Sequence, residues 1–206
     1  MLDPRHRNVF HNTSSLDEFV DAYIQDFSRG LKAVDVAALA QAITAIQTAI
    51  DNGKRLYVVG NGGSAAIADH LVCDFAKGTD TEGHPALAVQ SLASAPALIS
   101  ALANDFGLEH VFAKQVGYFC QPQDVLIAIS SSGNSANIIN AVTEAKSRDV
   151  AVVGLSGFAG GKLAELADIP LYVPVDNYAV VEDCHQSLMH VITLVIARRR
   201  EGTLGW

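Results

Sequence analysis

Two short polar segments of this 206-residue chain carry groups that bind anions, and each follows an apolar run. The first is Gly60-Asn61-Gly62-Gly63-Ser64, and the second is Ser130-Ser131-Ser132-Gly133-Asn134-Ser135. Glycine lets a ligand approach the backbone closely, while hydroxyls and free amides at a helix start form an uncharged cradle for phosphate. Each segment alone also fits a structural role, a tight turn for the first and a helix cap with a flexible turn for the second. The first matches neither the GxxxxGKS/T loop nor the GxGxxG pattern, so a nucleotide ligand has little support.

One pair of ionisable side chains stands at helical spacing. His70 and Asp74 are four residues apart, so a helix places them on one face. There a carboxylate and an imidazole can share a metal ion or a proton. The same spacing is also typical of a surface ion pair or of a capped core histidine.

The hydrophobic pattern predicts the elements that position these groups. Apolar residues recur at helical spacing over 15–31 and 35–51, and Ser15 with Glu18 forms a plausible capping box for the first helix. Five apolar runs then predict strands at 56–59, 86–89, 125–129, 150–155 and 169–175. Helical composition follows at 65–76, 136–146, 162–167 and finally about 179–200.

Strands that alternate with helices and are apolar throughout indicate an α/β fold, a doubly wound five-stranded parallel sheet covered on both faces. In such sheets ligands bind beyond the carboxyl ends of the strands, where the strand order switches. Because both polar segments directly follow strands, we expect them to lie at that edge and to form one site.

Composition excludes several classes of protein. Half of the residues are hydrophobic and 17% are charged, which is incompatible with intrinsic disorder. The formal charge of −8 argues against nucleic acid and against an anionic membrane as the main ligand. The low charge, together with the two apolar leading helices, predicts a homo-oligomer.

The sequence predicts neither a signal peptide nor a membrane span. The first 15 residues lack the apolar core of a signal peptide, and the longest aliphatic stretch, 191–197, is too short to span a bilayer. The three cysteines, Cys73, Cys120 and Cys184, form no close-spaced framework. We therefore expect reduced thiols and a cytoplasmic protein.

The sequences GNGGS at 60–64 and SSSGNSANI at 130–138, with a terminal helix that carries His185 and His190, resemble the sugar isomerase (SIS) domain. Within that superfamily the chain resembles the phosphoheptose isomerases, which interconvert sedoheptulose 7-phosphate and an aldose heptose 7-phosphate. The similarity extends from about residue 15 to 200. It implies a single SIS domain over 1–206, with a helical oligomerisation segment at 1–53 and the α/β core and closing helix at 54–206.

The resemblance assigns the site residue by residue. It implies that substrate is bound by Asn61, Gly62, Gly63, Ser64, Asn104, Asp105, Ser130, Ser131, Ser132 and Ser135. It implies a zinc site made by His70, Asp74, Glu182 and His190, a donor set that manganese or iron could also use. Asp74 and His190 would transfer the proton through an enediol, with zinc as Lewis acid. The family also forms tetramers with sites between subunits.

Several positions depart from the family pattern. Asp74 and Glu182 stand where the family usually has glutamate and glutamine, and Ser94-Ala95-Pro96 replaces polar residues, which together favour a different sugar phosphate. Glu182 and His190 are also eight residues apart, about 12 Å along a straight helix. One ion can reach both only if Glu182 belongs to an irregular helix start or to another subunit. Helical spacing alone would instead pair Gln186 with His190, or Glu182 with His185.

Three functions remain open. The first is a ketose–aldose isomerase that acts on sedoheptulose 7-phosphate or a similar phosphosugar. The second is a non-catalytic binding protein, because one member of the same subfamily associates with the bacterial replication initiator without catalysing the reaction. The third is a regulatory sensor of sugar phosphates. The intact glycine and serine segments and the paired ionisable residues favour the enzyme.

Overall fold

Two helices precede a regular alternation of strands and helices. The computed structural model describes residues 12–84 and 87–204. The elements in chain order are α1 (Leu16–Lys32), α2 (Val36–Asp51), β1 (Leu56–Val59), α3 (Gly63–Gly78), β2 (Val89–Ser91), α4 (Pro96–Phe106), the 3-10 helix η2 (Leu108–His110), α5 (Val111–Phe119), β3 (Val125–Ser130), α6 (Ala136–Ser147), β4 (Ala151–Ser156), α7 (Gly161–Leu166), β5 (Ile169–Tyr172) and α8 (Tyr178–Arg200).

The five strands form one all-parallel sheet in the order β2-β1-β3-β4-β5, which confirms the predicted fold class. From β1 the chain moves outward to β2, then returns to place β3 on the other side of β1. The strand order therefore switches between β1 and β3. The segment 60–64, the glycine turn, follows β1, and the segment 130–135, the serine loop, follows β3. Both predicted segments therefore lie at this switch point.

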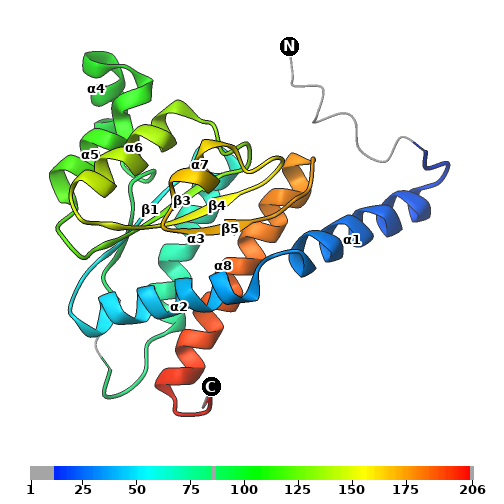
Figure 1. The fold of residues 1–206 in the computed structure, drawn as a ribbon, viewed down its shortest axis with the longest axis horizontal. Helices are drawn as coiled ribbons and strands as arrows, with labels where there is room; N and C mark the ends of the chain where they lie inside the picture. Colours follow the sequence, from blue (N-terminus) through cyan, green and yellow to red (C-terminus); the bar gives the residue numbers. More distant parts are fainter. Residues whose placement is uncertain (1–11, 85–86, 205–206) are drawn as a thin grey trace.

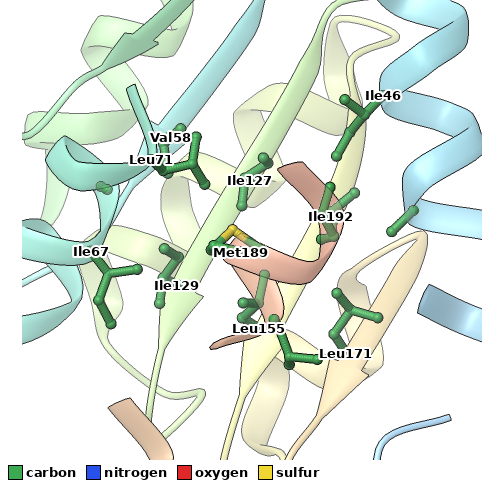
Figure 2. Packing of buried hydrophobic residues seen from close by; sticks show 14 of the residues in the cluster. Ile46, Val58, Ile67, Leu71, Ile127, Ile129, Leu155, Leu171, Met189 and Ile192 are labelled. Carbon is green, nitrogen blue, oxygen red and sulfur yellow. The ribbon is translucent and has the colours of Figure 1, made fainter. Parts of the chain in front are cut away.

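Apolar side chains alternate between two cores because successive residues of a strand point to opposite faces. One core holds Val58, Ile127 and Leu155 against helices α2, α3 and α8, and Figure 2 shows Met189 and Ile192 of α8 among these strand residues. The other core packs neighbouring strand residues, such as Tyr57 and Leu126, against helices α4 to α7. Helices thus cover both faces of the sheet (Figure 1).

Helix α1 extends away from the rest of the molecule in Figure 1. Its later turns pack through Tyr23, Phe27 and Leu31 on the core that contains α8. Its capping box is half formed, since the Ser15 side chain accepts from the Glu18 amide at 3.2 Å, while the Glu18 carboxylate accepts from Ser14. Among the described residues no single helix is long and apolar enough to cross a membrane, although α1 and α2 pass that test as a pair bent by 67°.

Three elements between β2 and β3 were not predicted from the sequence. Helix α4 follows Ala95 and α5 follows His110, and neither residue makes a side-chain capping bond, so the capping signal of a helix start is missing. The signal left unused was Pro96 at the first position of α4. The predicted strand at 86–89 is also displaced, because β2 begins only at Val89, while Ala86 lies outside the described residues. The predicted strand at 169–175 is shorter and ends at Tyr172.

Candidate active site

A hollow of about 140 Å³ opens where β1 and β3 end. It is lined by Asn61, Ser64, Ile129, Ser130, Ser131, Ser132, Ser135, Tyr178 and Glu182. Six of the predicted substrate-binding residues are thus brought together from two segments about 70 residues apart in the chain. Among these lining residues only Glu182 is charged at neutral pH, so the rest of the hollow is an uncharged, mainly polar surface.

The glycine turn brings the start of α3 against α8. Gly62 has φ 54° and ψ −121°, a conformation that only glycine adopts without strain. A Cβ on Gly63 would collide with the carboxylate of Glu182, so the absence of a side chain lets the two helices meet. Asn61 joins the turn to α6, because its amide and that of Asn137 donate to each other at 2.9 Å in both directions.

The serine loop presents hydroxyls and amides that helix α6 does not use itself. Ser135 is the N-cap residue of α6 but makes no side-chain capping bond, so the first amides of the helix are left for another acceptor. Its hydroxyl instead accepts from Ser130 at 3.3 Å. The hydroxyl of Ser131 is buried and has no hydrogen-bond partner in the described structure. A buried polar atom without a partner carries a free-energy cost that a bound anion would remove.

Three ionisable side chains meet between α3 and α8, further from the start of these helices than the hollow is. His70 Nε2 lies 3.3 Å from Asp74 Oδ1 within α3, and His190 Nδ1 of α8 lies 2.9 Å from Asp74 Oδ2. The two imidazole rings meet edge to face, with centroids 5.1 Å apart. One ligand atom from each residue lies within 4.8 Å of the others, so these three residues could hold a metal ion.

Glu182, the fourth predicted ligand, lies in the hollow instead. Its carboxylate packs on Gly63 and lines the same surface as the serine loop. It does not belong to the group made by His70, Asp74 and His190. Helix α8 is regular from Tyr178 onward, so about 12 Å of helix separate Glu182 from His190 within one chain.

Of the two pairings expected on α8 from helical spacing, one is present. Gln186 Nε2 lies 3.0 Å from His190 Nε2. His185 does not pair with Glu182, because its Nε2 contacts the Ser156 carbonyl oxygen at 3.2 Å and its Nδ1 has no partner in the described structure. Burial lowers the pKa of His185 to about 4, so this histidine is a neutral core residue.

The lining of the hollow differs from the prediction in two ways. Asn104 and Asp105 hydrogen-bond to each other at 2.9 Å on the exposed end of α4, and neither lines the hollow within one chain. Tyr178 lines the hollow but was not predicted, and its ring packs on Phe158 with centroids 4.7 Å apart. The signal was the capping residue Asn177, which accepts from the Val180 amide and moves the helix start to Tyr178.

A larger hollow of about 650 Å³ lies at the opposite edge of the sheet, where β3 and β4 begin. Its most prominent charged groups, Lys146 and Asp168, already pair with each other at 2.5 Å. The residues that line it include no histidine, cysteine or serine. The chemistry is therefore concentrated at the carboxyl end of the strands.

Comparison with known proteins agrees with this placement. Residues 22–157 match the SIS domain family. A phosphoheptose isomerase from Geotalea daltonii is 36% identical to this chain, over 80% of this chain and 85% of the relative. One from Bradyrhizobium sp. (strain ORS 278) is also 36% identical, over 87% and 93%. The chain belongs to the phosphoheptose isomerase family.

Solved structures show that the fold of this family extends over nearly the whole chain. The phosphoheptose isomerase from Neisseria gonorrhoeae has a TM-score of 0.81 and 34% sequence identity, and the match covers 88% of this chain and 98% of that chain. The enzyme from Francisella tularensis has a TM-score of 0.83 and 33% identity, with 89% and 96% covered. This phosphoheptose isomerase relative is therefore an SIS-fold protein from its leading helices to α8.

Proposed function

We propose that the protein is a ketose–aldose isomerase that acts on sedoheptulose 7-phosphate or a phosphosugar of similar length. The observation that carries the proposal is the pairing of two sites on helices α3 and α8. An uncharged serine and amide cradle, formed by the loop between β3 and α6, borders the start of these helices, and a His–Asp–His group lies further along them. Membership of the phosphoheptose isomerase family supports this assignment.

The serine loop would bind the phosphate group. Ser131 offers an unpaired buried hydroxyl, and the uncapped start of α6 offers backbone amides. Such groups hold a phosphate without a lysine or arginine. Binding at this remote group would align the reacting carbons at the other end of the sugar.

The separation of the two sites favours a long sugar. Gly63 contacts Glu182, and Asp74 contacts His190, so α3 and α8 run side by side in the same direction. From Glu182 to His190 the distance along the helix is about 12 Å. An extended seven-carbon sugar phosphate spans roughly 10 Å from phosphorus to C1, estimated from bonds of about 1.5 Å. A pentose phosphate would be shorter by two of these bonds.

We assign the proton transfer to Asp74 and His190. One of them removes a proton from C1 of the ketose, which gives an enediol, and a proton is then returned to C2 to give the aldose. Their side chains are 21% and 45% exposed, so a sugar can reach both. His190 Nδ1 lies 2.9 Å from Asp74 Oδ2, close enough for the two groups to act on the same sugar carbon atoms in turn.

The same residues fit a divalent metal ion. Two imidazoles and a carboxylate are ligands that zinc prefers, and manganese or iron can use them as well. We therefore propose that His70, Asp74 and His190 hold zinc, and that Glu182 joins them only through another subunit. When bound, zinc would supply Lewis acidity at the carbonyl oxygen.

We also propose a cytoplasmic homotetramer, with residues 1–53 as the oligomerisation segment of a single SIS domain. The support is a stripe on α1 formed by Leu16, Val20 and Ile24, which are 76%, 45% and 55% exposed. These residues follow one another at a spacing of four, so they form one apolar face of the helix. Contact between subunits would cover this face.

Exchange of substrate protons with solvent tests the proposed reaction. Sedoheptulose 7-phosphate is incubated with the protein in D₂O, with zinc and then with a chelator, and its C1 and C2 protons are followed by NMR. We expect deuterium to enter the sugar as the aldose forms. Both processes should be lost in Asp74→Asn and His190→Ala. Binding of the sugar without exchange would contradict the enzyme and favour the binding protein or the sensor.

A further inference from the structure

Both ring nitrogens of His190 face polar side chains of this chain. Its Nδ1 lies 2.9 Å from Asp74 Oδ2, and its Nε2 lies 3.0 Å from the amide nitrogen of Gln186. In this orientation of the Gln186 amide its nitrogen donates, so Nε2 is the acceptor. The ring proton is therefore on Nδ1, the nitrogen that faces Asp74 Oδ2. His70 packs edge-on against the same ring and limits its rotation.

Gln186 is half-buried one turn before His190, so the backbone of α8 fixes the distance between the two side chains. A histidine that binds metal through one nitrogen carries its proton on the other, and a nearby acceptor usually holds that proton. If Nδ1 binds a metal, Nε2 becomes a donor. A glutamine amide can then turn over and accept through Oε1, because it has a donor end and an acceptor end.

We infer that Gln186 is a positioning residue that sets the tautomer of His190. It directs Nδ1 toward Asp74 and His70 in the metal-free protein, and it holds the Nε2 proton when Nδ1 binds a divalent cation. The second half of this inference rests on the metal site in the proposed function. The first half depends only on the contacts between Gln186, His190 and Asp74.

Direct zinc affinity is the first test. Zinc binding to the full chain is measured by competition with a chromogenic chelator, without substrate. Gln186→Met keeps the size of the side chain but cannot hydrogen-bond through an amide, and we expect it to weaken binding by about 10–100-fold. Gln186→Glu can still accept the Nε2 proton, so it should bind zinc at least as tightly as the unmodified chain.

A matched control exists on another helix. On α2, the side-chain amide of Gln47 donates a hydrogen bond to Asp51 at 2.7 Å, and the two residues are also four positions apart. Gln47→Met should leave zinc affinity unchanged. Circular dichroism identifies any variant that does not fold. If Gln186→Met does not fold, the zinc affinity of Gln186→Glu is compared with that of the unmodified chain. Equal zinc affinity in Gln186→Met and Gln47→Met would overturn the inference for the metal-bound state.

The ¹⁵N resonances of His190 test the tautomer without metal or sugar. In the metal-free chain we expect a protonated Nδ1 and an unprotonated Nε2, and in Gln186→Met a shift toward the other tautomer. Unchanged resonances in Gln186→Met would overturn the inference for the metal-free state. An incorrect substrate assignment affects neither measurement, whereas it abolishes the exchange of sugar protons, so the two failures are distinguishable.

Discussion

Glu182 places a carboxylate in a hollow that we propose binds a phosphate. The resemblance to the phosphoheptose isomerases implies glutamine at this position. Two negative charges about 6 Å apart repel each other by roughly 3 kcal/mol at an effective dielectric constant of about 20. Glu182 therefore weakens phosphate binding, unless it contacts another part of the sugar.

Glu182→Gln separates this role from metal binding. Removing the charge should lower the KM for the phosphosugar by about tenfold or more, since about 1.4 kcal/mol corresponds to a factor of ten. Zinc affinity of the isolated subunit should be unchanged, because Glu182 lies outside the group of three ligands. Steady-state kinetics and chelator competition measure the two effects. Weaker zinc binding in Glu182→Gln would instead place this carboxylate among the ligands.

His185 makes the stability of the protein depend on pH. Its ring is fully buried, and burial lowers its pKa from 6.5 to about 4. The unfolded chain therefore binds a proton more readily than the folded one between these values. The stability that depends on a neutral His185 is fully present above pH 6.5, and it is lost as the pH falls through about 4. The loss amounts to about 3 kcal/mol, from about 1.4 kcal/mol per pKa unit.

His185→Gln tests this contribution, because glutamine can donate to the Ser156 carbonyl but does not titrate in this range. We expect the free energy of unfolding in urea to vary less between pH 4 and pH 7 in this variant than in the unmodified chain. The test compares how steeply the free energy of unfolding changes with pH in the two proteins, and not their absolute stabilities. An identical slope in the two proteins would assign the pH dependence to other groups.

Among the elements, the loops after β1 and β3 are joined by one pair of side chains. Asn61 and Asn137 exchange two hydrogen bonds of 2.9 Å, which fixes the glycine turn relative to the start of α6. Removing one partner leaves the other amide without its bonds in a partly buried place. We expect Asn137→Ala to lower stability by about 1–3 kcal/mol and to raise the KM for the phosphosugar.

A double-mutant cycle measures how strongly the two loops are coupled. Asn61→Ala and Asn137→Ala share the same bonds, so their effects should not add, with an interaction energy of about 0.5–3 kcal/mol. The control is Asn140→Ala, whose amide bonds to the Glu109 carbonyl on the outer side of α6. Additive effects of Asn61→Ala and Asn137→Ala on stability and on KM would show that the pair does not join the loops.

The sequence predicted the elements whose signals are local. The apolar runs of β1 and β3 and the polar segments after them locate the switch point, and the spacing of four pairs His70 with Asp74 and Gln186 with His190. Helices α4 and α5 were missed because they lack capping side chains. The contact between Asp74 and His190 depends on how α3 packs on α8, which no local pattern encodes.

At the scale of the whole molecule, a single chain does not bring all of the assigned site residues together. The resemblance assigns Glu182 and His190 to one metal, yet regular helix separates them by about 12 Å. Asn104 and Asp105 also lie outside the hollow of their own chain. If sites lie between subunits, a neighbouring chain supplies the missing residues to both the hollow and the metal group. Activity should then depend on the oligomer.

The exposed stripe on α1 allows that dependence to be tested. In the triple variant Leu16→Glu, Val20→Glu and Ile24→Glu, three exposed apolar residues become charged. Charges buried at a subunit contact carry a large desolvation cost, so we expect light scattering to show species smaller than the proposed tetramer.

Within one chain these side chains are exposed, so secondary structure should be unchanged by circular dichroism, while isomerase activity falls with the loss of the tetramer. Leu108→Glu is the control, because Leu108 is an apolar residue that is 63% exposed and belongs to η2, which packs beside α4 and α6. It should keep both the tetramer and the activity. A triple variant that is dissociated yet fully active would place the whole catalytic site within a single chain.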